Sequence, residues 1–201
     1  MLIGQHGQKQ RLPGDPGVTP EGAAQAEATA AWLAHREDLV AVWTSPMRRA
    51  VETAEPIARM TGRRLVTDAR LRERMNWDDP SVESVEEFAN GWRRASADRE
   101  WVPRSGDSSR AAGDRFIAAL CDLVHTYDEG AAVVVAHGGV TVDALRNLLG
   151  DELLGAEGPR LIDDGVPCCA ITTLAFHGDH WELEHLASSA HLPRPVPQGD
   201  H

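Results

Sequence analysis

Residues whose side chains could handle a phosphate ester occur at separate places in the chain. His6 is followed by glycine, His137 is followed by two glycines, and Arg49 comes shortly after Ser45-Pro46. An imidazole can attack phosphorus as a nucleophile, and a guanidinium matches the geometry of phosphate oxygens. Glycine beside a histidine lets the backbone approach an anion closely. Together these residue types point to phosphoryl-transfer chemistry.

Each of these residues follows a segment whose composition is typical of a β-strand. The segments are 1–4, 39–44 and 131–136. The last is apolar on both faces, as buried parallel strands tend to be. Because the carboxyl ends of parallel strands meet at one edge of a sheet, we expect His6, Arg49 and His137 to converge there.

Helical patterns alternate with the predicted strands. The predicted helices are 19–36, 45–60, 82–95, 108–127 and 141–149, and the further strands are 63–67, 170–176 and 181–186. This alternation predicts an α/β fold with three layers, in which a mostly parallel open sheet has helices on both faces. We expect residues 1–190 to form a single domain with a helical cap insertion at about 76–104, and residues 191–201 to be a frayed tail.

Composition limits the partners and the compartment that we expect. The formal net charge of −11 over 201 residues disfavours nucleic acid and acidic membranes, because both attract positive proteins. No apolar run approaches the roughly 20 residues that cross a bilayer. The first motif begins almost at Met1, and the three cysteines are an odd number that includes the adjacent Cys168 and Cys169. Neither a signal peptide nor a disulfide framework is predicted, so we expect a cytoplasmic location.

Taken together, the motifs resemble those of the histidine phosphatase superfamily, which is also called phosphoglycerate mutase-like. The segments that carry the resemblance are Leu2-Ile3-Gly4-Gln5-His6-Gly7, Val18-Thr19-Pro20-Glu21-Gly22 with Gln25-Ala26, Thr44-Ser45-Pro46-Met47-Arg48-Arg49-Ala50 with Thr53-Ala54, and Val134-Val135-Ala136-His137-Gly138-Gly139. Weaker matches are Leu71-Arg72-Glu73 and Ser105-Gly106-Asp107-Ser108. The resemblance extends from Leu2 to about Gly150, and the motifs are specific in combination.

This resemblance implies a role for each site residue. His6 would be the nucleophile that becomes phosphohistidine. Glu73 would protonate the leaving oxygen and then act as the base for water, and His137 would donate to the phosphoryl oxygens. The implied phosphate-binding residues are Gln5, Gly7, Arg49 and Gly138. The implied activity is metal-independent hydrolysis of a small phosphorylated metabolite. No metal or other cofactor is expected, and a homodimer is left open.

Position 5 departs from the family pattern, which has arginine immediately before the catalytic histidine. Gln5 offers a neutral amide instead, and charge-assisted hydrogen bonds are roughly twice as strong as neutral ones. Losing one preorganised donor can slow a reaction by on the order of a hundredfold. Lys9, Arg11 and Arg48 are close in sequence, and one of them could substitute in space. The alternative is a degenerate family member that binds a phosphate ester or a similar anion without hydrolysing it.

Further alternatives concern the cap, the late histidines and mutase activity. Most of the aromatic residues of the cap segment are expected to pack it onto the core rather than to stack on substrate; they are Trp77, Phe88, Trp92 and Trp101. One of them near the entrance would favour an apolar or aromatic leaving group. Four late histidines lack clean metal-ligand spacing; they are His177, His180, His185 and His191. A phosphoglycerate-type mutase is disfavoured because the similar mutases are longer. The identity of the substrate is not encoded in any motif.

Overall fold

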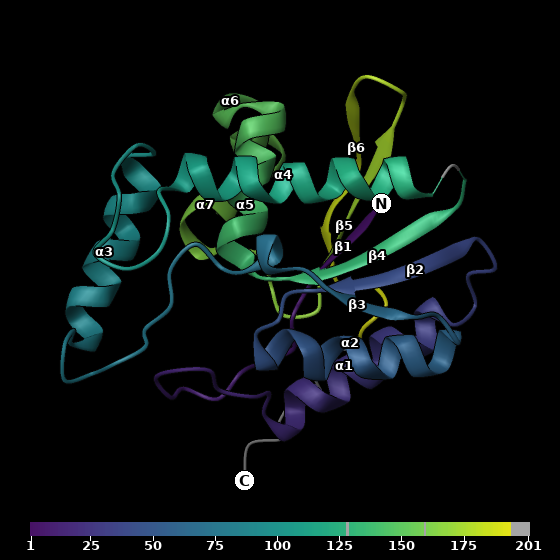
Figure 1. The fold of residues 1–201 in the computed structure, drawn as a ribbon, viewed down its shortest axis with the longest axis horizontal. Helices are drawn as coiled ribbons and strands as arrows, with labels where there is room; N and C mark the ends of the chain where they lie inside the picture. The colour runs from purple at the N-terminus through teal and green to yellow at the C-terminus, as the bar shows by residue number, and fades with distance from the viewer. Residues whose placement is uncertain (128, 159, 194–201) are drawn as a thin grey trace, which may run out of the picture.

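A six-stranded sheet with the order β3-β2-β4-β1-β5-β6 forms the centre of the computed structural model, which describes residues 1–127, 129–158 and 160–193 (Figure 1). The strands are β1 (Leu2–Gln5), β2 (Leu39–Thr44), β3 (Leu65–Thr67), β4 (Ala131–Ala136), β5 (Ile171–Phe176) and β6 (Trp181–Ser188). Strand β4 pairs in parallel with β1 and β2, and β2 pairs in parallel with β3. Among the described strands, the antiparallel pairs are β5 with β1 and β6 with β5.

Helices cover both faces of this sheet, which confirms the predicted α/β class and its layers (Figure 1). The helices are α1 (Pro20–Leu33), α2 (Arg48–Thr61), α3 (Val85–Ala97), α4 (Ser109–Thr126), α5 (Gly138–Leu149), α6 (Asp151–Glu157) and α7 (Leu161–Asp164), with a 3₁₀ turn η1 at Ala69–Leu71. Helices α1 and α2 pack on one face, and α4 and α5 pack on the other. No described helix is both long enough and apolar enough to cross a membrane.

The side chains of β4 alternate between the two layers of the core. Val133 and Val135 belong to the cluster that includes Leu33 of α1 and other residues of the α1–α2 face. Val134, between them, belongs to the cluster that includes Phe116 of α4. The strand is therefore apolar at every position because helices bury both of its faces.

Helix ends explain where the observed elements differ from the predicted ones. Thr19 caps α1 by accepting the N–H of Gly22, so the helix begins at Pro20. Helix α5 begins at Gly138, earlier than the predicted residue 141, because His137 is extended and acts as the N-cap residue. Helices α6 and α7 were not predicted. Leu154 is the single buried residue of α6 and α7 has none, so neither helix has an apolar period to recognise.

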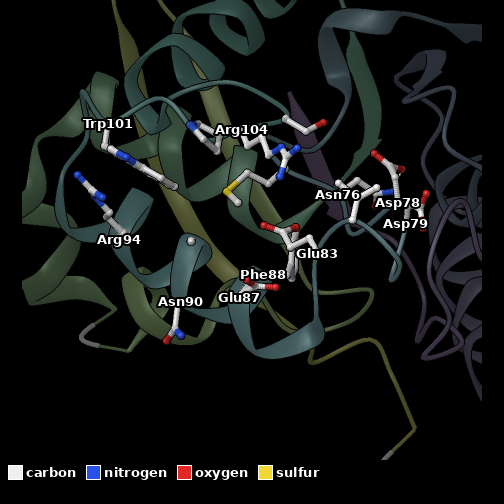
Figure 2. Close-up of a pocket in the computed structure, with 15 residues that line it drawn as sticks. Asn76, Asp78, Asp79, Glu83, Glu87, Phe88, Asn90, Arg94, Trp101 and Arg104 are labelled. Carbon is white, nitrogen blue, oxygen red and sulfur yellow. Dashed lines mark hydrogen bonds between the residues drawn. The ribbon is translucent and has the colours of Figure 1, made fainter.

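The segment predicted to be a cap, 76–104, contains α3, which lies apart from the sheet layers in Figure 1. Ser84 and Glu87 form a capping box at its start, so the helix begins later than the predicted residue 82. Between α3 and its flanking loops lies a cavity of about 510 Å³, where Arg94 stacks on Trp101 (Figure 2). Of the predicted tail, residues 194–201 lie outside the described residues.

Candidate active site

The carboxyl ends of β1, β2 and β4 bring the histidines and the arginine of the sequence motifs together. The backbone N–H of His6 donates to Ala136 at 3.1 Å, and that of Ser45 donates to Val135 at 3.0 Å, so the three strand ends are joined. The rings of His6 and His137 lie edge to face with their centroids 5.2 Å apart. In front of them is a cavity of about 620 Å³, whose lining includes His6, Arg49, Glu73 and Gly138.

The contacts of His6 fix its tautomer, with the ring proton on Nδ1 and none on Nε2. Its Nδ1 lies 2.7 Å from the carbonyl oxygen of Gly7, to which only an N–H can donate, so the lone pair is on Nε2. Arg49 donates through Nε to that Nε2 at 3.2 Å. Burial lowers the pKa of His6 to about 3, and the charges of Arg49 and Lys9 act in the same direction. The imidazole is therefore neutral at physiological pH and presents a nucleophilic nitrogen.

Arg49 is buried in the first turn of α2, at 2% exposure, although its sequence neighbour Arg48 is exposed. The Nη1 atom of Arg49 has no hydrogen-bond partner among the described residues, and its nearest acidic atom is an oxygen of Asp15 at 3.8 Å. Arg48 instead pairs with Glu52 on the helix surface at 2.7 Å. A buried guanidinium with an unused donor is suited to bind an anion that enters from the cavity.

His137 lies behind His6 and is fully buried. Its Nε2 atom is 2.8 Å from the hydroxyl of Ser45, whereas its Nδ1 has no partner in the described part of the chain. Burial, and next the charge of Arg49, lowers the pKa of His137 well below the usual histidine value. His137 is thus a neutral imidazole with one ring nitrogen that no described residue contacts by a hydrogen bond. Sequence reasoning did not assign Ser45, although its place directly after a strand in a Ser-Pro motif was the available signal.

Glu73 reaches the first turn of α5. Its Oε2 accepts the N–H of Gly139 at 3.0 Å, and its Oε1 accepts the N–H of Val140 at 2.7 Å. A Cβ atom on Gly139 would lie 2.7 Å from Oε1 of Glu73 and 2.5 Å from the ring of Trp92, so a larger residue there would displace one of these side chains. Backbone donors at a helix start orient the carboxylate beside the cavity.

The remaining predicted residues occupy different places around the nucleophile. Gln5 is buried at 9% exposure; its Nε2 lies 3.4 Å from Nε2 of His6, and its Oε1 has no partner among the described residues. Gly138 lines the cavity. Gly7 donates its N–H to Thr53 at 2.9 Å, and a Cβ on Gly7 would lie 2.5 Å from the carbonyl oxygen of Gly22. The N–H of Gly7 is therefore used within the protein, and the residue allows close packing of the loop on α1.

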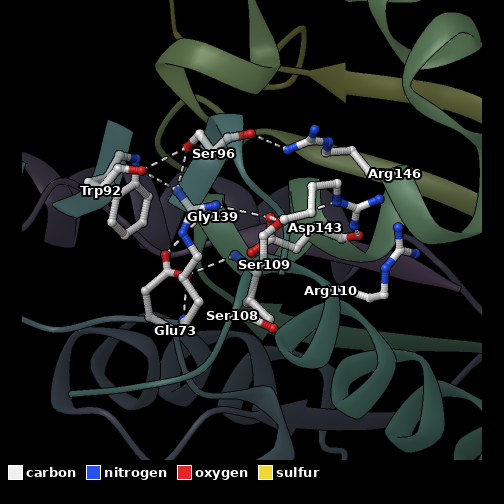
Figure 3. Close-up of polar contacts among 12 residues, drawn as sticks. Glu73, Trp92, Ser96, Ser108, Ser109, Arg110, Gly139, Asp143 and Arg146 are labelled. Atoms are coloured by element: carbon white, nitrogen blue, oxygen red, sulfur yellow. Dashed lines mark hydrogen bonds and ion pairs between the residues drawn. The ribbon is translucent and has the colours of Figure 1, made fainter. Parts of the chain in front are cut away.

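A buried ion pair next to Glu73 was not predicted from the sequence. Arg74 contacts Asp143 of α5 at 3.0 Å, with both side chains at or below 2% exposure. Ser109 also donates to Asp143 (Figure 3). Ser96 of α3 accepts from Arg74 at 2.6 Å, and the guanidinium of Arg74 lies 4.0 Å from the centre of the Trp92 ring. In the sequence, Arg74 follows Arg70 and Arg72 and reads as a solvated charge. Burial raises the pKa of Asp143 to about 6, against the opposing effect of Arg74.

Known phosphatases resemble this chain in both sequence and fold. Residues 4–189 match the family model described as the histidine phosphatase superfamily (branch 1). The chain is 32% identical to a glucosyl-3-phosphoglycerate phosphatase of Mycobacterium tuberculosis across 98% of this chain and 97% of that protein. It is 49% identical to an uncharacterised protein of the same organism across 84% and 82% of the two chains. A solved mycobacterial glucosyl-3-phosphoglycerate phosphatase with inorganic phosphate superposes with a TM-score of 0.75 at 26% identity, covering 96% of this chain and 99% of that one.

Proposed function

The chain belongs to the histidine phosphatase superfamily and is a phosphomonoesterase, and we propose that it works through a phosphohistidine formed on Nε2 of His6. One observation carries the proposal. The Nδ1–H of His6 donates a hydrogen bond to the Gly7 carbonyl, so the unprotonated Nε2 faces Arg49 at the cavity. That arrangement supplies a neutral nucleophile beside a cationic phosphate clamp, which in-line phosphoryl transfer requires.

In the first step, Nε2 of His6 attacks phosphorus and the bond from phosphorus to the ester oxygen breaks. Arg49 and His137 donate to the nonbridging oxygens of the transferring phosphoryl group, where negative charge gathers in the transition state. When the Ser45 hydroxyl donates to Nε2 of His137, the proton of that ring lies on Nδ1, the nitrogen left without a partner. Glu73, in its protonated form, gives its proton to the leaving oxygen, and the alcohol departs.

In the second step, water replaces the alcohol. The Glu73 carboxylate is held by the N–H groups of Gly139 and Val140. It takes a proton from water while the water oxygen attacks phosphorus. The N–P bond breaks, the electron pair returns to Nε2 of His6, and inorganic phosphate leaves. The sum of both steps is ester plus water giving alcohol plus phosphate, with each residue restored.

The substrate class follows from the cavity and from the relatives. Small phosphorylated metabolites are the substrates named for the matched phosphatases, including glucosyl-3-phosphoglycerate. The cavity of about 620 Å³ is lined on the cap side by Trp77, Phe88 and Trp92. We therefore propose a small phosphate monoester whose alcohol portion packs against these aromatic rings, while the phosphate lies between His6 and Arg49. A noncatalytic anion-binding protein is not favoured, because the nucleophile, the acid and the clamp arginine share one cavity.

The test is release of inorganic phosphate from a panel of phosphorylated sugars, hydroxy acids and amino acids, with glucosyl-3-phosphoglycerate included. The wild-type chain should hydrolyse at least one member, and His6→Ala should hydrolyse none. Exchange between 2- and 3-phosphoglycerate in the same preparations tests the disfavoured mutase. Hydrolysis of every substrate by His6→Ala at the wild-type rate would refute the proposed nucleophile. A cytoplasmic location, a homodimer and a single domain over residues 1–190 stay predictions from the sequence.

A further inference from the structure

The positive charge of Arg49 alone does not balance the negative charge of a bound phosphate monoester. A phosphate monoester carries up to about two negative charges at neutral pH. Arg49 supplies one positive charge, and Gln5, beside the nucleophile, supplies none. Among the described residues that line the cavity, the other cationic side chains are Lys9 and Arg11.

Lys9 is carried by a loop that is fixed on both sides. The N–H of Gln8 donates to the Gln25 side chain at 2.9 Å, and the carbonyl of Gln8 accepts from the backbone of Thr19 at 2.8 Å. Lys9 itself forms a β-bridge with Val18. The backbone of Lys9, three residues after His6, is thereby held in place at the cavity, so the flexible part is the side chain alone.

The ammonium group of Lys9 lies in the field of the active-site cations. In the described part of the chain, Lys9 forms no ion pair with an acidic side chain. Its residue is exposed as a whole, yet partial burial and next the charges of Arg49 and Arg11 lower its pKa. The charge of Lys9 in turn lowers the pKa of His6. Lys9, Arg11 and Arg49 thus place three positive charges at the cavity, of which that of Lys9 is not paired with an acidic side chain among the described residues, and such a group is suited to receive an anion.

We propose that Lys9, the only lysine in the sequence, supplies the second positive charge of the phosphate site. It thereby takes the role of the arginine that the family pattern has at position 5, where this chain has Gln5. This inference rests on the proposed function, because it assigns a further residue to the same site. An ammonium on a flexible stem can reach a phosphoryl oxygen as a compact point charge, whereas a guanidinium at position 5 would bind as a fixed fork.

The first test measures binding rather than turnover, with inorganic phosphate as the probe and isothermal titration calorimetry as the readout. Lys9→Met should weaken phosphate binding by on the order of tenfold to a hundredfold, as expected for the loss of a charged hydrogen bond. Lys9→Arg should retain most of the affinity. The matched control is Arg63→Met, which removes one positive charge from an exposed site outside the cavity and should leave binding unchanged.

The second test asks whether positions 5 and 9 share one task. Gln5→Arg should raise phosphate affinity and turnover in the wild-type chain, and the gain should be larger in the Lys9→Met background, where it restores a missing charge. Additive effects of the two substitutions would overturn the replacement, as would wild-type phosphate affinity in Lys9→Met. A loss confined to larger esters, with inorganic phosphate bound normally, would place Lys9 on the alcohol portion and also overturn it. Because phosphate binding needs no turnover, failure of a phosphohistidine to form would be seen separately.

Discussion

Glu73 accepts the backbone N–H of Val140 at 2.7 Å, so the candidate acid is attached to the helix that begins directly after His137. We predict that Glu73→Gln, which keeps the shape and removes the proton, slows hydrolysis of alkyl phosphates by about a hundredfold to ten-thousandfold. With an activated ester such as p-nitrophenyl phosphate, the leaving group needs no proton. The first step should then survive while the attack of water is slow, so phosphoenzyme accumulates.

Rapid-quench measurement of the p-nitrophenolate burst checks this prediction. The control is Glu55→Gln, which neutralises an exposed acid of α2 outside the cavity. Equal losses in the rate of phosphoenzyme formation from the alkyl and the activated ester would show that Glu73 is not the proton donor, since the loss in the first step would then not depend on the leaving group.

The Ser45 hydroxyl lies 2.8 Å from Nε2 of His137, and when it donates there the ring proton is on Nδ1. We expect Ser45→Ala to lower kcat by about tenfold to a hundredfold, because the donor at Nδ1 is no longer fixed. It should also cost about 1–3 kcal/mol of stability, since it leaves a buried polar atom unpaired. Nitrogen NMR of labelled histidine reports the tautomer directly. An unchanged tautomer together with unchanged kcat would remove Ser45 from the mechanism.

The buried pair of Arg74 and Asp143 joins the segment that carries Glu73 to α5. Removing one partner should cost about 3–5 kcal/mol, because the other charge is left buried without compensation. Arg74→Met and Asp143→Leu are each expected to show this loss in urea unfolding. The double variant should recover much of it, since no isolated charge then remains. Simple addition of the two losses would argue that the residues do not act as a pair.

Stability should fall as the pH drops below the ordinary histidine range. The pKa of His6 is about 3 in the folded chain against 6.5 when exposed, so between these values the unfolded state binds more protons. The free energy of unfolding therefore decreases on acidification, by up to about 1.4 kcal/mol per pH unit for one such group. His137 acts in the same direction. Asp143, with its pKa raised from 3.8 to about 6, acts in the opposite direction between those values.

Urea unfolding at pH 7 and pH 5 measures this balance. The wild-type chain should be less stable at pH 5, and His6→Asn should show a smaller difference between the two conditions because one buried histidine is absent. A wild-type chain more stable at pH 5 than at pH 7 would contradict the assignment of neutral, buried histidines.

Local sequence pattern was enough for the elements that carry the site. Strands 39–44 and 131–136 were predicted with the observed bounds, because helices bury both faces of β4 and leave a continuous apolar run. Features that depend on tertiary contacts could not be predicted from the sequence. Arg74 is charged in a charged segment, and only folding buries it against Asp143. Likewise, nothing local indicates that the Ser45 hydroxyl meets His137, which lies 92 positions away.

The central claim is that a phosphoryl group is carried on His6, and trapping this acid-labile phosphoenzyme tests it most directly. Protein mixed with p-nitrophenyl phosphate in the presence of a chelator is quenched and examined for a phosphate adduct that is stable to base and labile to acid, with His6→Ala as the control. We predict an adduct that requires His6 and disappears as substrate is exhausted. No adduct in folded wild-type protein that binds inorganic phosphate, or an equal adduct in His6→Ala, would contradict the phosphohistidine mechanism.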